Sequence, residues 1–304
     1  MNDPGREVLK RAVFIAGPTS SGKSALAVEW ARRHGGEIVC ADAFQLYREF
    51  PVLSAQPSEA ERARVPHHLF GAAGCADAMD AARYAQMALA VIAEIVARGR
   101  IPFVVGGSGL YIHALTSGLP DVPAIDPEIR ERVRAMKLRD MVRALGELDP
   151  AALDIIDSRN PRRVARRLEI CLKSGRPASE VLAPNPPVAG LRGVVLAPRR
   201  EDLHDRIARA VGERLSGGAV EEVRAVRQSA GLTARQILGW REITGLLDGS
   251  ISLEECREQL TSATRRYAKR QLTWFRSKLT LPPVDPTAVT PEILERTARL
   301  PGLP

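Results

Sequence analysis

Hydrophobic residues along the chain gather in short runs separated by amphipathic segments. Four runs have the length and apolar content of buried strands, and glycine, proline or polar residues bound them: 11–17, 37–41, 101–105 and 191–198. The segment after the first run carries Leu26, Ala27 and Trp30 at helical spacing, and an alanine-rich helical pattern covers 79–98. Strands that alternate with helices predict an α/β fold, in which helices cover both faces of a parallel sheet.

This alternation stops between residues 119 and 190. Helical patterns occur there at 127–147 and 161–174, and no convincing strand does. We therefore predict a P-loop NTPase-like core domain, formed by 1–118 and 191–304, with a helical insertion domain at 119–190. Helices are expected over most of 202–278. The proline-punctuated tail from Leu281 is expected to be peripheral.

A phosphate-binding motif follows the first predicted strand. Residues 17–24 read GPTSSGKS and fit G-x-x-x-x-G-K-[ST] between a strand and a helix. Backbone N–H groups of such a loop converge on phosphate oxygens, the helix N-terminus adds partial positive charge, and Lys23 adds a full one. The Ser24 hydroxyl is placed to hold Mg²⁺. A glycine-rich turn with an incidental lysine is the weaker alternative.

Asp42 is the candidate for the chemical step. A hydrolytic P-loop ATPase usually holds Mg²⁺ with an aspartate at the end of an apolar strand. Here the strand at 101–105 instead runs into Gly106 and Gly107. Asp42 follows the strand at 37–41, at the edge where open α/β sheets bind ligands. This position favours a group-transfer enzyme in which Asp42 faces the acceptor, and a helix N-cap is the alternative.

Charge and cysteine usage narrow the class of protein. Lys and Arg number 44 against 36 Asp and Glu, and the net charge of +8 favours an anionic partner such as a nucleic acid. The four cysteines form no C-x-x-C pair, which excludes a disulfide scaffold and a zinc site of the usual spacing. No run approaches 18 apolar residues and no signal-like core opens the chain. We expect a cytoplasmic protein without a membrane partner.

Two basic segments lie where the pattern is helical. Residues 157–167 hold five arginines, among them Arg159, Arg163 and Arg166. Residues 264–276 interleave basic with aromatic residues, and there the aromatics fall on an apolar stripe that favours core packing over stacking on bases. Near a phosphate loop, the arginines favour contacts with a nucleic-acid backbone over a merely solvated face.

Together these segments resemble the tRNA dimethylallyltransferases, also called tRNA isopentenyltransferases. The resemblance spans about Val13 to Lys278 and rests on motifs in a fixed order: GPTSSGKSALA, ADAFQLYR, VPHHLF, VVGGSGLYIHAL, DPEIR, NPRRVARRLEI, ILGWREI and TRRYAKRQLTWFR. The last of these, behind that P-loop, is highly specific. The chain carries no C-terminal zinc finger, so it is similar to the bacterial type.

The resemblance implies transfer of a dimethylallyl group from dimethylallyl diphosphate to tRNA, with release of diphosphate. The acceptor would be the exocyclic amine of the adenosine 3′-adjacent to the anticodon, taken out of its stack. Mg²⁺ would be the cofactor and the anticodon stem-loop the partner, and we expect a monomer because nothing in the sequence demands a dimer. The P-loop would bind the diphosphate rather than ATP, through Gly17, Pro18, Thr19, Ser20, Ser21, Gly22, Lys23 and Ser24.

The resemblance also assigns roles in catalysis and RNA binding. Asp42 would be the general base, Lys23 would neutralise the leaving diphosphate, and Ser24 would assist Mg²⁺. Gln45 would help position the base, and Ser108 retains the hydroxyl of a family threonine. The implied tRNA-binding residues, with the insertion as a clamp, are Asp42, Ala43, Phe44, Gln45, Ser108, Arg130, Arg162, Arg163, Arg166, Trp240 and Arg241.

The chain departs from the family pattern at three places, and two other classes of function stay open. Ala43 replaces a serine, Gln56 replaces a lysine, and Asp157-Ser158-Arg159-Asn160 replaces H-P-N-D, all outside the donor site. An adenylate isopentenyltransferase or a small-molecule P-loop kinase would explain the P-loop and Asp42 but not the arginine-rich segments. A nucleic-acid-binding ATPase would explain the charge but requires a Walker-B acid that we do not find.

Overall fold

The computed structural model describes residues 4–120, 122, 124–183 and 185–300. Its centre is a six-stranded sheet in the order β3-β2-β4-β1-β5-β6, in which every pairing is parallel. The strands are β1 (Val13–Ala16), β2 (Gly36–Cys40), β3 (His67–His68), β4 (Ile101–Gly106), β5 (Arg192–Leu196) and β6 (Pro283–Val284). The predicted α/β class with a parallel sheet is confirmed. The two-residue edge strands β3 and β6 are too short to give a periodic signal.

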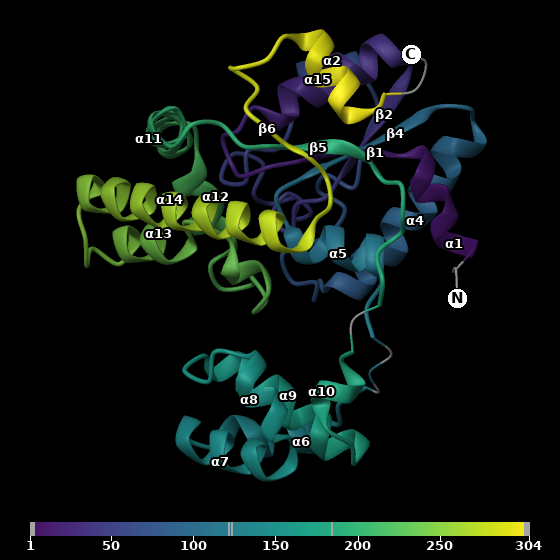
Figure 1. The fold of residues 1–304 in the computed structure, drawn as a ribbon. Helices are drawn as coiled ribbons and strands as arrows, with labels where there is room; N and C mark the ends of the chain where they lie inside the picture. The colour runs from purple at the N-terminus through teal and green to yellow at the C-terminus, as the bar shows by residue number, and fades with distance from the viewer. Residues whose placement is uncertain (1–3, 121, 123, 184, 301–304) are drawn as a thin grey trace. The chain divides into compact units, whose positions relative to one another are not determined.

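Helices cover both faces of the sheet (Figure 1). On one face, Val13 and Ile15 of β1 belong to a buried cluster that includes Trp30 of α2 (Lys23–His34). On the other face, α4 (Ala81–Ala97) contacts β2 and β4. Successive residues of a strand point to opposite faces, so strands buried on both sides must be apolar throughout. This is why the four longer strands stood out in the sequence.

Other helices also belong to the core domain. They are α1 (Pro4–Glu7), η1 (Val8–Arg11), α3 (Glu59–Arg64), α5 (Gly109–Ser117), α11 (Arg200–Ser216), α12 (Ala219–Val226), η2 (Ala234–Gln236), α13 (Trp240–Leu247) and α14 (Leu253–Lys278). Ile207 and Val211 of α11 pack with Leu260 and Ala268 of α14, and a capping box at Ser252 begins α14. Across the part of the chain that is described, no helix has the length and apolar character that a membrane span requires.

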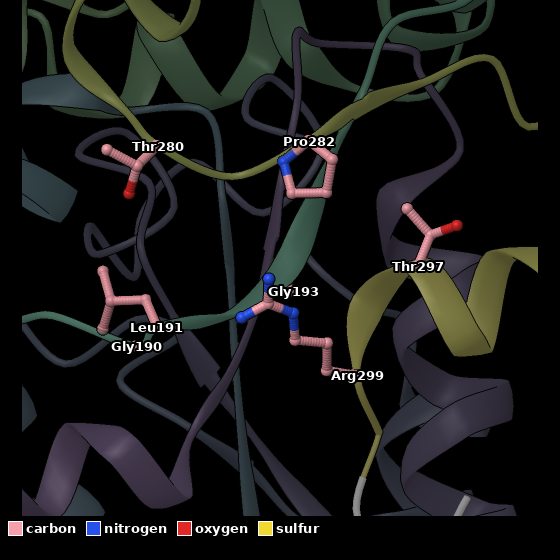
Figure 2. A pocket seen from close by; sticks show the side chains of 7 residues that line it. All are labelled: Gly190, Leu191, Gly193, Thr280, Pro282, Thr297 and Arg299. Atoms are coloured by element: carbon pink, nitrogen blue, oxygen red, sulfur yellow. The ribbon is translucent and has the colours of Figure 1, made fainter. Parts of the chain in front are cut away.

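The C-terminal tail is not peripheral, and that expectation was wrong. Val284 of β6 and Leu294 of α15 (Pro291–Ala298) are buried in the same cluster as β1 and α2. Prolines interrupt long elements, but they are tolerated at a sheet edge and in the first turn of a helix. Where the tail crosses the amino ends of β5 and β6, it forms a pocket of about 220 Å³ into which the Arg299 side chain extends (Figure 2). That end of the sheet is opposite the P-loop.

Residues 117–186 form a second compact unit, separate from the unit made of 1–116 and 187–304. The sequence placed these boundaries at 119 and 190. The second unit contains α6 (Pro127–Ala135), α7 (Leu138–Leu148), α8 (Pro150–Ile155), α9 (Pro161–Ser174) and α10 (Ala178–Val181). Its own core includes Val133, Leu145, Val164 and Leu168.

One predicted helix of this unit is in fact two. The segment 127–147 breaks at Met136 and Lys137, whose backbones are extended, although no glycine or proline marks the break. A straight helix over the whole segment would be about 30 Å long, whereas α9, with 14 residues, is only about 21 Å long. The break allows both halves to pack against α9.

Candidate functional site at the P-loop

The P-loop connects β1 to α2 with a backbone that suits an anion. Ser20 and Gly22 have φ angles of 61° and 91°, a left-handed conformation that turns successive N–H groups to one side. The hydroxyl oxygens of Ser20 and Ser21 are buried without a hydrogen-bond partner. Buried hydroxyls are normally satisfied, and Ser20 lines the cavity described below, so its hydroxyl points to a ligand with acceptor oxygens, whereas Ser21 is 1% exposed and lies outside that lining.

Lys23 is the first residue of α2 and its side chain is buried. Its Nζ donates a hydrogen bond to the Pro18 carbonyl at 3.2 Å. Burial lowers the pKa of Lys23, because the charged ammonium loses hydration, while the nearby Asp42 carboxylate raises it. A buried cation of this kind interacts strongly with an anionic ligand that displaces water.

Asp42 lies directly beyond β2. The residues on either side of it, Ala41 and Ala43, form hydrogen bonds with the loop after β4. Ser108 joins the two loops, because its N–H donates to the Ala41 carbonyl at 3.2 Å and its Oγ accepts the Ala43 N–H at 2.8 Å. A Cβ atom at Gly106 would lie 2.0 Å from the Ala41 carbonyl oxygen. Glycine at position 106 therefore permits the two strand ends to approach so closely.

A cavity of about 350 Å³ lies between the P-loop and Asp42. Its walls combine P-loop residues with Gln45 and with the α11 residues Arg206 and Arg214. Arg214 is half-buried, and the loss of hydration lowers its pKa, while Asp42 opposes this shift as it does for Lys23. The cavity thus places one carboxylate close to two desolvated cations. That combination can bind a polyanion and still provide a base.

Sequence reasoning missed the α11 arginines. A signal for them exists, since Arg206, Ala210 and Arg214 are spaced four residues apart and all line the cavity. Residues at that spacing lie on one face of a helix, and a small alanine between two arginines leaves room for a ligand. The sequence alone does not show that this face of α11 meets the P-loop, which lies almost two hundred residues earlier.

Helix α14 supplies a buried polar residue to the same region. Gln271 accepts the Thr19 N–H at 3.0 Å through Oε1 and donates from Nε2 to the Gly107 carbonyl at 2.8 Å. The Tyr267 hydroxyl lies within hydrogen-bonding reach of Ser108 and Gln271, and burial raises its pKa. Sequence reasoning counted Tyr267 in an apolar stripe and gave Gln271 no role.

Three other candidate residues do not line this cavity. Phe44 is beside Asp42, and its ring centroid is 5.9 Å from that of Tyr267. Trp240, half-buried at the start of α13, packs edge-on against Phe50, and Arg241 next to it is exposed. Neither Trp240 nor Arg241 lines the cavity.

The arginines predicted in the insertion belong to the second unit. Arg130 of α6 is exposed, as are three arginines in the first half of α9: Arg162, Arg163 and Arg166. The Asn160 side chain caps α9 by accepting the N–H groups of Arg162 and Arg163 at 3.1 and 3.3 Å. Val164 and Leu168 turn the opposite face of the helix to the core, so the arginines must face solvent.

The oxygen donors of the cavity suit Mg²⁺ rather than a softer metal. The Ser24 hydroxyl and the Asp42 carboxylate both line it, and Mg²⁺ is usually held by one or two such groups together with substrate phosphates. Among the residues described, no three His, Cys, Asp or Glu side chains gather as a metal site.

Comparison with known proteins gives a consistent family. A family profile described as IPP transferase matches residues 45–278. A tRNA dimethylallyltransferase from Parvibaculum lavamentivorans is 44% identical over 282 residues, which is 90% of each chain. The crystal structure of a tRNA isopentenylpyrophosphate transferase from Bacillus halodurans is similar with a TM-score of 0.68 and 34% identity, over 95% of this chain and 94% of that one. A eukaryotic dimethylallyltransferase acting on tRNA is similar with a TM-score of 0.75 and 26% identity, over 87% of this chain and 69% of that one.

Proposed function

The chain belongs to the IPP transferase family, and we propose that it is a tRNA dimethylallyltransferase. It transfers the dimethylallyl group of dimethylallyl diphosphate to the exocyclic amine of the adenosine 3′-adjacent to the anticodon. The observation that carries this proposal is the position of Asp42, whose carboxylate lines the same cavity as Lys23 and Arg214. A base and an anion site that share one cavity suit displacement of a diphosphate by an amine.

The donor diphosphate binds at the P-loop. Backbone N–H groups and the hydroxyl of Ser20 donate to its oxygens, and Lys23 and Arg214 neutralise the negative charge that grows as it leaves. The Ser24 hydroxyl would hold Mg²⁺. When bound, Mg²⁺ supplies further charge neutralisation to the diphosphate. The family relation and the oxygen donors of the cavity support this assignment.

The acceptor adenine approaches from the side of Asp42. The amine nitrogen forms a bond to the C1 carbon of the dimethylallyl group, and the C–O bond to diphosphate breaks with its electron pair on oxygen. Asp42 receives the proton that the amine loses. Gln45 lines the cavity beside Asp42 and orients the base, while Ala43, Phe44 and Ser108 form the adjoining loops.

The RNA is bound by charge outside the cavity. The exposed arginines of the insertion contact the backbone of the anticodon stem-loop, among them Arg130, Arg163 and Arg166. Arg241, an exposed residue of the core domain, adds a further contact with the RNA. Single-stranded loops expose bases that can be turned out of their stack at low cost. We place the enzyme in the cytoplasm, where tRNA is found, and expect it to act as a monomer.

The test is a transfer assay. The protein, Mg²⁺, dimethylallyl diphosphate and an unmodified anticodon stem-loop are incubated, and the digested RNA is examined by mass spectrometry. One prenylated adenosine beside the anticodon is expected, with a rate at least ~100-fold lower for Asp42→Asn at unchanged thermal stability. Equal activity on AMP would instead support an adenylate isopentenyltransferase. An RNA-stimulated ATPase without transfer would support the third class.

A further inference from the structure

The amide of Gln45 is held in one orientation by backbone carbonyls. Its Nε2 donates to the Ser54 carbonyl at 3.2 Å and to the Ala55 carbonyl at 2.6 Å. Carbonyls only accept hydrogen bonds, so the nitrogen end of the amide must face them. The Oε1 end, which the Cys40 thiol contacts at 3.9 Å, is then the end that can accept from an amine.

The orientation of Gln45 therefore depends on the segment 50–57. Ala55 has a φ of 54°, a left-handed conformation that a residue with a Cβ atom adopts only when its surroundings impose it. Within the segment, the Ala55 N–H donates to the Val52 carbonyl and the Ser54 N–H to the Phe50 carbonyl. These short-range bonds shape the turn, but they do not attach it to the rest of the protein.

The buried side chains of Phe50 and Leu53 attach the segment through apolar packing, and Glu222 of α12 attaches its backbone by hydrogen bonds. Its Oε1 accepts the Val52 N–H at 2.7 Å and its Oε2 accepts the Leu53 N–H at 2.8 Å, across about 170 residues of sequence. Both bonds have the short length of charge-assisted hydrogen bonds. Glu222 is half-buried, and burial raises its pKa although the two N–H groups oppose the shift. Glu222 does not line the cavity between the P-loop and Asp42, so its carboxylate is not placed to contact a ligand there.

We propose that Glu222 is a positioning residue for the acceptor base, which acts by holding the 50–57 segment so that the Ser54 and Ala55 carbonyls orient the Gln45 amide. This inference rests on the proposed function. It extends the site to a helix that the sequence analysis did not connect with the chemistry. It also gives a role to the segment in which Gln56 replaces the usual lysine, since the backbone carbonyls there, not a charged side chain, contact Gln45.

The experiment compares Glu222→Gln with Glu221→Gln, its neighbour on α12 that is exposed and pairs with Arg224 at the surface. An amide in place of Glu222 turns an N–H group toward one of the two backbone N–H donors, so one bond is lost. We expect kcat/KM for the anticodon stem-loop to fall about tenfold. The KM for dimethylallyl diphosphate should change less than about twofold, and Glu221→Gln should match the wild type.

A double-mutant cycle separates positioning from a general structural role. If Glu222 acts through Gln45, then Glu222→Gln should lower kcat/KM by less than about twofold in a Gln45→Ala background. An undiminished tenfold loss in that background, or no loss in the wild-type background, would overturn the inference. Should Glu222→Gln fail to fold, Glu222→Asp replaces it in the same cycle, because it keeps the charge and shortens the reach.

Two readouts keep this inference distinct from the proposed function. A wild-type protein that prenylates neither the stem-loop nor a full tRNA contradicts the proposed function. Amide hydrogen exchange of the 50–57 segment then tests the attachment without any activity, and exchange there should be faster in Glu222→Gln than in Glu221→Gln. Equal exchange in the two variants would show that Glu222 does not hold the segment.

Discussion

The side-chain oxygen of Gln271 accepts the backbone N–H of Thr19 across 252 residues of sequence. Through its nitrogen the same amide holds the Gly107 carbonyl, so one residue of α14 joins the P-loop to the loop beside Asp42. A Cβ atom at Gly107 would lie 2.2 Å from that nitrogen, which shows how closely the elements pack. The donor and acceptor sides of the cavity are thereby held at a defined separation.

Replacing Gln271 with leucine should impair both stability and catalysis. The change leaves the half-buried Thr19 N–H and the buried Gly107 carbonyl without these partners, and an unsatisfied buried group costs about 1–3 kcal/mol. We expect a lower melting temperature and a kcat/KM for dimethylallyl diphosphate reduced about tenfold or more. Gln259→Leu, an exposed position on the same helix, is the control. A Gln271→Leu enzyme with wild-type kinetics would contradict a linking role.

Arg214 should contribute to diphosphate affinity. Arg214→Ala removes a half-buried cation from the cavity, and we expect the KM for dimethylallyl diphosphate to rise at least about tenfold. Inhibition by inorganic diphosphate should weaken in parallel. Arg209→Ala, on an exposed position of the same helix outside the cavity, should leave both constants unchanged. Equal effects of the two substitutions would point to general electrostatics instead.

The alkaline limb of the pH–rate profile should reflect the deprotonation of Lys23. Burial lowers the pKa of Lys23, so the ammonium loses its proton at a lower pH than an ordinary lysine would. As pH rises through that value the site loses a positive charge, and kcat/KM for the donor should fall. Lys23→Arg should remove this limb, because a guanidinium stays protonated. A limb that persists in Lys23→Arg would belong to another group.

Arg163 should contribute to RNA affinity through phosphate contact. Arg163→Ala retains a good helix former on α9, so the insertion should stay folded. We expect weaker binding of the anticodon stem-loop at low salt, and a slope of log K against log salt smaller in magnitude by about 1. Arg139→Ala, which removes a highly exposed arginine of α7, is the matched control. Binding that keeps its salt dependence would exclude Arg163 from the interface.

The C-terminal helix should contribute to stability rather than to catalysis. Leu294 is 5% exposed in the main core cluster, whereas Ile293 beside it is 50% exposed. Leu294→Ala should lower the free energy of unfolding by about 2–4 kcal/mol, and Ile293→Ala by less than about 1 kcal/mol. Denaturant unfolding measures both. Similar losses of unfolding free energy for the two variants would show that the tail does not contribute to the core.

The sequence predicted those parts of the fold and of the site that short stretches of the chain encode locally. The apolar strands, the P-loop at 17–24 and the acid at Asp42 are each encoded within a few consecutive residues, where backbone preference and motif spacing act directly. The motifs also identify the family, which the comparisons confirm. The sequence predicted one continuous helical segment over 127–147 and a peripheral tail. Both predictions were wrong, because the break at Met136 and the burial of the tail depend on what each segment packs against.

Only the tertiary structure decided which distant residues line the cavity or hold the loops around it. Arg214, Gln271 and Glu222 lie on three helices that follow the insertion, and each meets a loop from the first fifth of the chain. A single polar side chain on an amphipathic helix has the same sequence signature whether it faces water or a buried carbonyl. Packing of α11, α12 and α14 beside the sheet makes that choice, because burial requires each of these groups to find a partner.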